Sequence, residues 1–135
     1  MVELSLKSEE NIKAIFSQIQ LFLTKLKDFM PAKKFSFEAG DLKVKSKDTI
    51  LLSKLSSGEK QLLILFIEAL LQKQRPYIFL ADEPELSLHI SWQRNIISAI
   101  RSINPNAQII VATHSPEIAG KYRSSILDME DIRNV

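Results

Sequence analysis

The sequence contains no cysteine, few glycines and no long hydrophobic run, and each absence excludes a class of protein. Without cysteine there are no disulfides and no thiolate chemistry, a composition that suits a cytoplasmic protein. The longest apolar run, residues 62–67, is far shorter than the ~20 residues that cross a bilayer, so we expect no membrane association. The first residues also lack the basic and then apolar pattern of a signal peptide.

What the chain does contain is the composition of an ordinary globular domain. It has 135 residues, of which 45% are hydrophobic and 25% charged, enough to bury one core. The formal net charge of +2 is small, so bulk charge makes no case for a nucleic-acid-binding protein.

A helical pattern runs from about residue 8 to residue 30 and ends before Pro31. Its apolar residues repeat every seven positions in two series, Ile12, Ile19 and Leu26 beside Ile15, Phe22 and Phe29. This pattern is typical of an amphipathic helix on a core, and equally of the last turns of a helical arm that leads into a globular head. We therefore assign residues 1–31 to a helix that ends a helical or coiled-coil insertion, and residues 32–135 to the globular lobe.

Alternating residues at 35–37 and 42–45, on either side of Ala39-Gly40-Asp41, predict a β-hairpin. Its polar face would carry a row of lysines, which is either a solvated edge or a contact to a phosphate backbone: Lys43, Lys45 and Lys47.

The remainder of the chain reads as alternating helices and strands. Ser56 and Glu59 form a capping-box pattern, so a helix begins at Ser56 or Ser57, and it is apolar almost all round. Later elements are a strand at 78–81 that looks buried on both faces, a helix at 91–103, a strand at 108–113, a short helix after Ser115 and a last strand at 125–129. Strand, helix and strand form a βαβ unit, which makes the two strands parallel.

Polar residues gather where these two parallel strands end. Asp82 and Glu83 follow the first strand, and Thr113-His114-Ser115 closes the second, so both groups lie at one edge of the sheet. Adjacent carboxylates can hold Mg²⁺ and activate water, and a histidine can donate to a phosphate oxygen. The helix start at Ser56-Ser57-Gly58 presents backbone amides to an anion. Together these features indicate phosphoryl chemistry, although an acidic strand end can also be simply solvated.

At these residues the chain resembles the ABC-type ATPase heads of the SMC, RecF and OLD class, including bacterial defence ATPases of the Septu and retron-associated kind. Residues 55–61, Leu-Ser-Ser-Gly-Glu-Lys-Gln, resemble the ABC signature, and residues 78–84, Ile-Phe-Leu-Ala-Asp-Glu-Pro, resemble Walker B. Residues 113–115 are similar to the switch-histidine loop, and residues 85–89 occupy the D-loop position. The resemblance covers about residues 35–130 and implies an α/β, P-loop NTPase-like carboxyl-terminal lobe with a parallel sheet and flanking helices.

The resemblance also implies roles for individual residues. Asp82 would hold Mg²⁺ through water, while Glu83 would polarise the attacking water and His114 would sense the γ-phosphate of ATP. The signature residues would contact a nucleotide bound by a second head in a dimer: Ser56, Ser57, Gly58 and Glu59. Ser57 stands where the family usually has a first glycine.

One motif of the family is absent, since glycines at 40, 58 and 120 cannot build a Gly-x-x-x-x-Gly-Lys-Ser/Thr loop. We therefore expect the isolated chain to be inactive. It would hydrolyse ATP once a Walker A lobe or a second ATPase head joins it. Nucleic acid or an effector nuclease would then be reached through the full assembly. The alternative is a non-catalytic module that docks on an intact ATPase and regulates it. A nuclease in its own right is disfavoured, because Walker B already accounts for the carboxylates.

Overall fold

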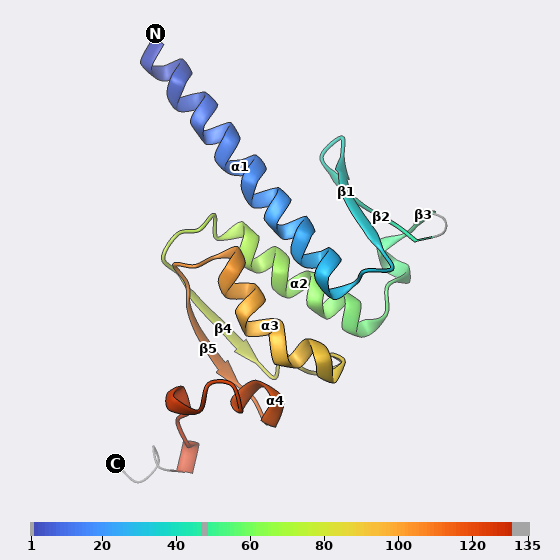
Figure 1. Ribbon diagram of the computed structural model, residues 1–135, viewed down its shortest axis with the longest axis vertical. Helices are drawn as coiled ribbons and strands as arrows, with labels where there is room; N and C mark the ends of the chain where they lie inside the picture. The colour runs from blue at the N-terminus through green and yellow to red at the C-terminus, as the bar shows by residue number, and fades with distance from the viewer. Residues whose placement is uncertain (1, 47–48, 131–135) are drawn as a thin grey trace.

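In the computed structural model of the protein, two helices pack side by side against a parallel pair of strands (Figure 1). The helices are α2 (Ser57–Leu71) and α3 (Ile90–Ile103), and the strands are β4 (Ile78–Asp82) and β5 (Gln108–Ala112). Strand register pairs Ile78 with Gln108 and Asp82 with Ala112, so both strands end at the same edge of the sheet. The structure describes residues 2–46 and 49–130, and it confirms the predicted βαβ unit.

Local sequence explains where the two helices begin and which face each one buries. Helix α2 starts at the predicted capping box, whose members are Ser56 and Glu59. The apolar face of α3 supplies Ile96, Ile100 and Ile103 to the core, as its spacing predicts. Trp92 is partly buried against the same core, with its ring centroid 6.2 Å from that of Phe29.

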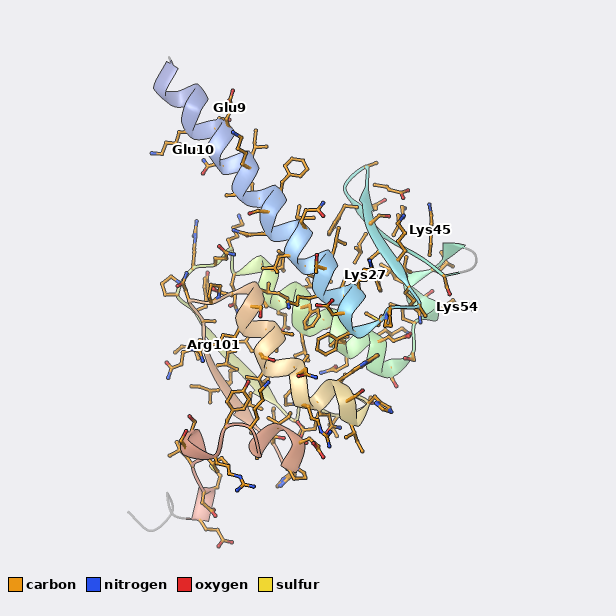
Figure 2. The ribbon with its side chains drawn as sticks, viewed as in Figure 1. Glu9, Glu10, Lys27, Lys45, Lys54 and Arg101 are labelled. Atoms are coloured by element: carbon orange, nitrogen blue, oxygen red, sulfur yellow. The ribbon has the colours of Figure 1, made fainter. Side chains whose placement is uncertain are left out.

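Helix α1 (Val2–Phe29) begins earlier than predicted and divides into two halves with different surroundings. Its second half packs on α2, α3 and β1, and buries Phe22 and Leu26 completely. Its first half extends beyond the body, where Figure 2 shows Glu9 and Glu10, and leaves apolar side chains exposed: Ile12, Ile15 and Phe16. The core-packed helix and the projecting arm are therefore both present in one helix, and the domain boundary at residue 31 stays a prediction.

The predicted hairpin is confirmed as β1 (Lys34–Glu38) paired antiparallel with β2 (Asp41–Lys45). Ala39 and Gly40 both have positive φ, 52° and 88°, which is the geometry of a tight hairpin turn. A short strand that the sequence did not predict, β3 (Thr49–Ile50), pairs with β2 and leads to the 3₁₀-helix η1 (Leu52–Lys54). On the outer face Lys43 and Lys45 approach Asp41 and Glu38, and Lys47 lies outside the described residues.

The prediction that strand 78–81 is buried on both faces is wrong. Phe79 is buried in the core, but Ile78 and Leu80 are 64% and 75% exposed, and Ile110 of β5 is 43% exposed. The reason is that, in the described part of the chain, helices cover one face of a sheet that has two strands. Helix α2 was likewise expected to be buried nearly all round, yet Ile64 and Leu71 are exposed.

The prediction of a last strand at 125–129 is also wrong. After α4 (Pro116–Ala119) the chain forms the 3₁₀-helix η2 (Arg123–Ser125), with no strand after β5 among the described residues. The apolar side chains that suggested a strand are not paired with the sheet and remain exposed: Ile126, Leu127 and Met129. Within the described ranges, no helix is both long enough and apolar enough to cross a membrane.

The two environments on α2 predict a difference between two truncations of similar size. Leu62→Ala removes a fully buried side chain and should lower the free energy of unfolding by about 2–5 kcal/mol. Ile64→Ala, the matched control on the exposed face of the same helix, should change it by less than about 1 kcal/mol. Urea denaturation monitored by circular dichroism measures both, and equal losses would contradict the assigned orientation of α2.

Candidate functional site

The carboxyl ends of β4 and β5 bring Glu83 and His114 together. The amide of Glu83 donates to the carbonyl of Ala112 at 2.8 Å, which continues the parallel ladder one residue past Asp82. Glu83 then adopts a positive φ of 45°, a conformation that residues other than glycine rarely adopt and that is concentrated at functional sites. Its Oε1 lies 3.3 Å from Nε2 of His114, so the predicted catalytic pair is in contact.

The two members of this pair differ in exposure. The His114 side chain is 96% exposed, whereas the Glu83 side chain is about one quarter exposed. Asp82, the predicted metal ligand, is exposed at the last position of β4. The carboxylates at this edge can orient water, and the solvent-facing imidazole of His114 can donate to an incoming anion.

A further carboxylate, Glu85, is buried beneath this edge. Its Oε1 accepts hydrogen bonds from the Thr113 hydroxyl, from the His114 amide at 3.2 Å and from the Ser115 amide at 3.1 Å. Its Oε2 is buried and has no hydrogen-bond partner. Burial alone would raise the pKa of Glu85, but the hydrogen bond from Thr113, the backbone amides and the neighbouring Glu83 side chain outweigh it and lower the pKa from its ordinary value. Glu85 is therefore ionised at neutral pH.

The predicted signature residues lie at the start of α2. Ser56 Oγ accepts from the Glu59 amide at 3.3 Å, and the Ser56 amide donates to Glu59 Oε2 at 2.9 Å. Lys33, in the connection between α1 and β1, donates to Glu59 Oε1. Both carboxylate oxygens of Glu59 are therefore engaged within the chain, while Ser56 and Ser57 are exposed. No hydrogen bond or ion pair joins this cluster to Glu83 or His114 in the described part of the chain.

Gly58 is buried, and the structure gives a local reason for glycine there. A Cβ built on Gly58 would lie 2.3 Å from the carbonyl oxygen of Ser87, in the segment between β4 and α3. Ser87 itself has a positive φ of 68°. Close packing against this segment is thus sufficient to require glycine at position 58. The predicted contact with a nucleotide on another subunit stays a prediction for all four signature residues: Ser56, Ser57, Gly58 and Glu59.

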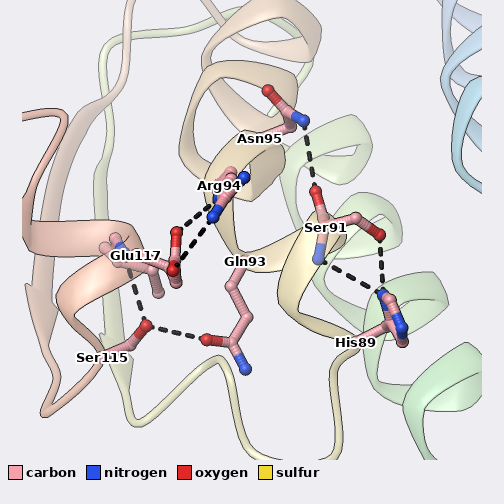
Figure 3. A network of polar contacts seen from close by, with 8 residues as sticks. His89, Ser91, Gln93, Arg94, Asn95, Ser115 and Glu117 are labelled. Atoms are coloured by element: carbon pink, nitrogen blue, oxygen red, sulfur yellow. Dashed lines mark hydrogen bonds and ion pairs between the residues drawn. The ribbon is translucent and has the colours of Figure 1, made fainter.

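His89 and Gln93 show how the segment between β4 and α3 is held (Figure 3). His89 Nδ1 accepts from the Ser91 amide at 3.3 Å and so caps α3. The Gln93 side chain donates to the Leu88 carbonyl at 3.0 Å and accepts from the Ser115 hydroxyl at 2.8 Å. The sequence placed Glu85 only within the D-loop position, residues 85–89, and assigned no role to Gln93 or Lys33, because a single polar residue carries no periodic or spacing signal. The short Asp-Glu-Pro-Glu run was the one hint for Glu85.

Comparisons with known proteins show which family the chain is similar to. The family described as "AAA domain, putative AbiEii toxin, Type IV TA system" matches residues 5–120. The Retron Ec83 probable ATPase of Escherichia coli is 51% identical over 41 residues, which is 30% of this chain and 8% of that protein. The Retron Vc95 probable ATPase of Vibrio cholerae serotype O1 biovar El Tor is 34% identical over 84 residues, 54% of this chain and 16% of that protein. The matches thus span less than a fifth of either relative.

A solved structure is similar in fold. The crystal structure of the SMC head bound to the C-winged helix domain of ScpA superposes with a TM-score of 0.65 at 20% identity, covering 84% of this chain and 40% of that one. This likeness confirms the predicted α/β, P-loop NTPase-like fold.

The contact between Gly58 and Ser87 predicts a large difference between two alanine substitutions at neighbouring positions. Gly58→Ala forces backbone apart and should destabilise the chain by about 1–3 kcal/mol. Ser57→Ala, the control at an exposed position one residue earlier, should stay within about 0.5 kcal/mol. Thermal unfolding of the isolated chain measures both, and an unchanged melting temperature for Gly58→Ala would show that glycine is not required by the fold.

The bond between Lys33 and Glu59 predicts a pH dependence. Burial would raise the pKa of Glu59, but Lys33 and Ser56 outweigh it and lower the pKa below its ordinary value of 4.5. A lowered carboxyl pKa contributes stability above pH 4.5 that is lost as the pH falls through the folded-state value. Lys33→Met should therefore cost about 1.5 kcal/mol at pH 7 and progressively less below pH 4.5. Unfolding from pH 7 to pH 3 tests this, with Lys34→Met as the exposed control; a pH-independent loss would contradict it.

Proposed function

This chain belongs to the family described as "AAA domain, putative AbiEii toxin, Type IV TA system", and we propose that it supplies the signature and Walker B half of an ATP-hydrolysing head. The resemblance of its sequence to ABC- and SMC-like ATPases of the defence type predicts this membership. The observation that carries this proposal is the contact of Glu83 with His114 at the carboxyl ends of β4 and β5. In open α/β sheets this edge is where ligands bind. In the proposed reaction Glu83 orients the attacking water and His114 donates to the γ-phosphate.

The donor set fits a magnesium ion that arrives with the nucleotide. Among the residues the structure describes, no group of three or more His, Asp or Glu side chains could hold a metal. Mg²⁺ in nucleotide sites needs only one or two carboxylates, because phosphates and waters complete its coordination. Asp82, exposed beside Glu83, is suited to that part through a bound water. Bound Mg²⁺ would neutralise charge that develops on the phosphates.

Completing the site requires residues from outside this chain. The sequence holds no Gly-x-x-x-x-Gly-Lys-Ser/Thr loop, and the exposed apolar face of β4 and β5 offers a surface for further structure: Ile78, Leu80 and Ile110. We propose that a Walker A lobe covers this face, and that a second head then meets Ser56 and Ser57 across a shared ATP. Both serines are exposed at the start of a 15-residue helix, where backbone amides favour an anion.

The names of the relatives support a place in bacterial defence, with partners reached through the whole assembly. Two of them are retron ATPases, and the structural neighbour is an SMC head seen with a partner domain. A groove of about 520 Å³ between α1 and the hairpin carries basic side chains and suits a nucleic-acid partner: Lys27, Lys34 and Lys45. Figure 2 shows Lys27 and Lys45 on the hairpin side of the molecule. An effector nuclease would join the same assembly.

The test is Glu83→Gln in the complete ATPase, formed from this chain and the lobe that carries its phosphate-binding loop. The amide keeps the shape of the side chain but cannot accept a proton, so kcat should fall by about 10² to 10⁴-fold while ATP binding persists. Glu68→Gln, on the exposed face of α2, should keep wild-type turnover. Wild-type kcat in Glu83→Gln would remove Glu83 from catalysis and favour a non-catalytic docking module.

A further inference from the structure

A buried, charged side chain that the proposed reaction does not use lies directly beneath the switch loop, residues 113–115. The Glu85 residue is 7% exposed, although a carboxylate is costly to bury unless its oxygens are hydrogen-bonded. Three donors from three successive residues converge on Oε1: the Thr113 hydroxyl, the His114 amide and the Ser115 amide. Hydrogen bonds to an ionised acceptor are about twice as strong as neutral ones, so this single oxygen fixes the backbone of the whole loop.

The position of His114 depends on that backbone. Its side chain is 96% exposed, so packing does not hold the imidazole, and its contact with Glu83 is a single one at 3.3 Å. The position of the imidazole is therefore set mainly by the backbone conformation of His114. The His114 amide is bonded to Glu85, and the residues on either side of it are bonded to the same oxygen.

A second bond ties the switch loop to the same segment of chain. Gln93 donates to the Leu88 carbonyl and accepts from the Ser115 hydroxyl, and Figure 3 shows the bond to Ser115. Ser115 Oγ also accepts from the Ile118 amide at 3.4 Å and caps α4. The segment that carries Glu85 and Leu88 also contains Ser87, whose carbonyl packs against Gly58. One short stretch, residues 85–88, therefore contacts both the switch loop and the start of α2.

We propose that Glu85 is a positioning residue for ATP hydrolysis: its carboxylate fixes the backbone of residues 113–115 and so places the His114 imidazole beside Glu83. This inference rests on the proposed function. Glu85 acts through His114 rather than on the substrate, so its loss should slow turnover and leave nucleotide binding unchanged. The buried Oε2, which has no partner, takes no part in holding the loop.

The test compares three variants in the complete ATPase. Glu85→Ala removes the acceptor and should lower kcat about tenfold or more, with KM for ATP within about twofold of wild type, since small misplacements of catalytic groups are costly. Glu85→Gln keeps a neutral Oε1 that can accept the same bonds, and should retain most of the turnover. Glu117→Ala, a carboxylate removed from an exposed ion pair with Arg94, is the control and should keep wild-type kcat.

A readout on this chain alone separates positioning from general destabilisation. In Glu85→Ala, amide hydrogen exchange should accelerate at His114 and Ser115 while the amides of α2 and α3 keep their wild-type protection. Uniform acceleration across the chain would mean that Glu85 only stabilises the fold. If Glu85→Ala does not fold, Thr113→Val is the second variant: it preserves side-chain shape but removes a hydroxyl that donates to Glu85 and accepts from the Ser115 amide at 3.0 Å. It should lower kcat severalfold, and wild-type kcat there would overturn the proposal.

The outcomes also distinguish this inference from the proposed function. Absence of ATP hydrolysis by the wild-type assembly would refute the proposed function. An active wild type with an equally active, folded Glu85→Ala would leave that function standing and overturn the role of Glu85. Equal losses in Glu85→Gln and Glu85→Ala would mean that negative charge, rather than hydrogen-bond acceptance, is required.

Discussion

The parallel pairing of β4 with β5 is the constraint on which the site depends. Because Asp82 pairs with Ala112, the residues that follow each strand leave the sheet at the same level. Helix α3 is the crossover connection between the two strands, which is the connection that adjacent parallel strands require. The apolar face of α3 packs in the core. A shift of one residue in this register would separate Glu83 from His114 and turn the buried Phe79 to solvent.

Polar contacts beneath the sheet edge turn this register into a defined site. The segment between β4 and α3 is bonded to the switch loop through Glu85 and Gln93, and touches α2 at Gly58. The start of α2 is in turn bonded to Lys33 at the foot of α1. Contacts within the chain thus link the segment after β4 to residues 113–115 and to α2, and link α2 to the residues that follow α1.

Periodicity and motif spacing predicted most of this architecture, since helix, hairpin and βαβ patterns depend on local sequence. The capping box at Ser56 and Glu59 and the order of strand ends were predicted for that reason. Exposure of Ile78 and Leu80 could not be, because an apolar run predicts burial without showing whether this chain itself supplies the residues that cover it. Residues 125–129 resembled a strand on the same kind of apolar pattern, which does not show whether a neighbouring strand is present. The contacts of Glu85 with residues 113–115 could not be predicted, because these partners lie some thirty residues away and are mostly backbone amides.

The contact of Gly58 with Ser87 has a consequence for how such sequences can be recombined. Gly58 lacks the Cβ that would collide with the Ser87 carbonyl, and the position of that carbonyl depends on the positive φ of Ser87. The two positions are therefore adapted to each other although about thirty residues of chain separate them. A chimera that takes residues 55–61 from one relative and residues 85–89 from another would bring together two surfaces that were never selected as a pair. Crossover points between relatives should therefore fall outside the interval from 55 to 89, and the two motifs are expected to be inherited as a unit.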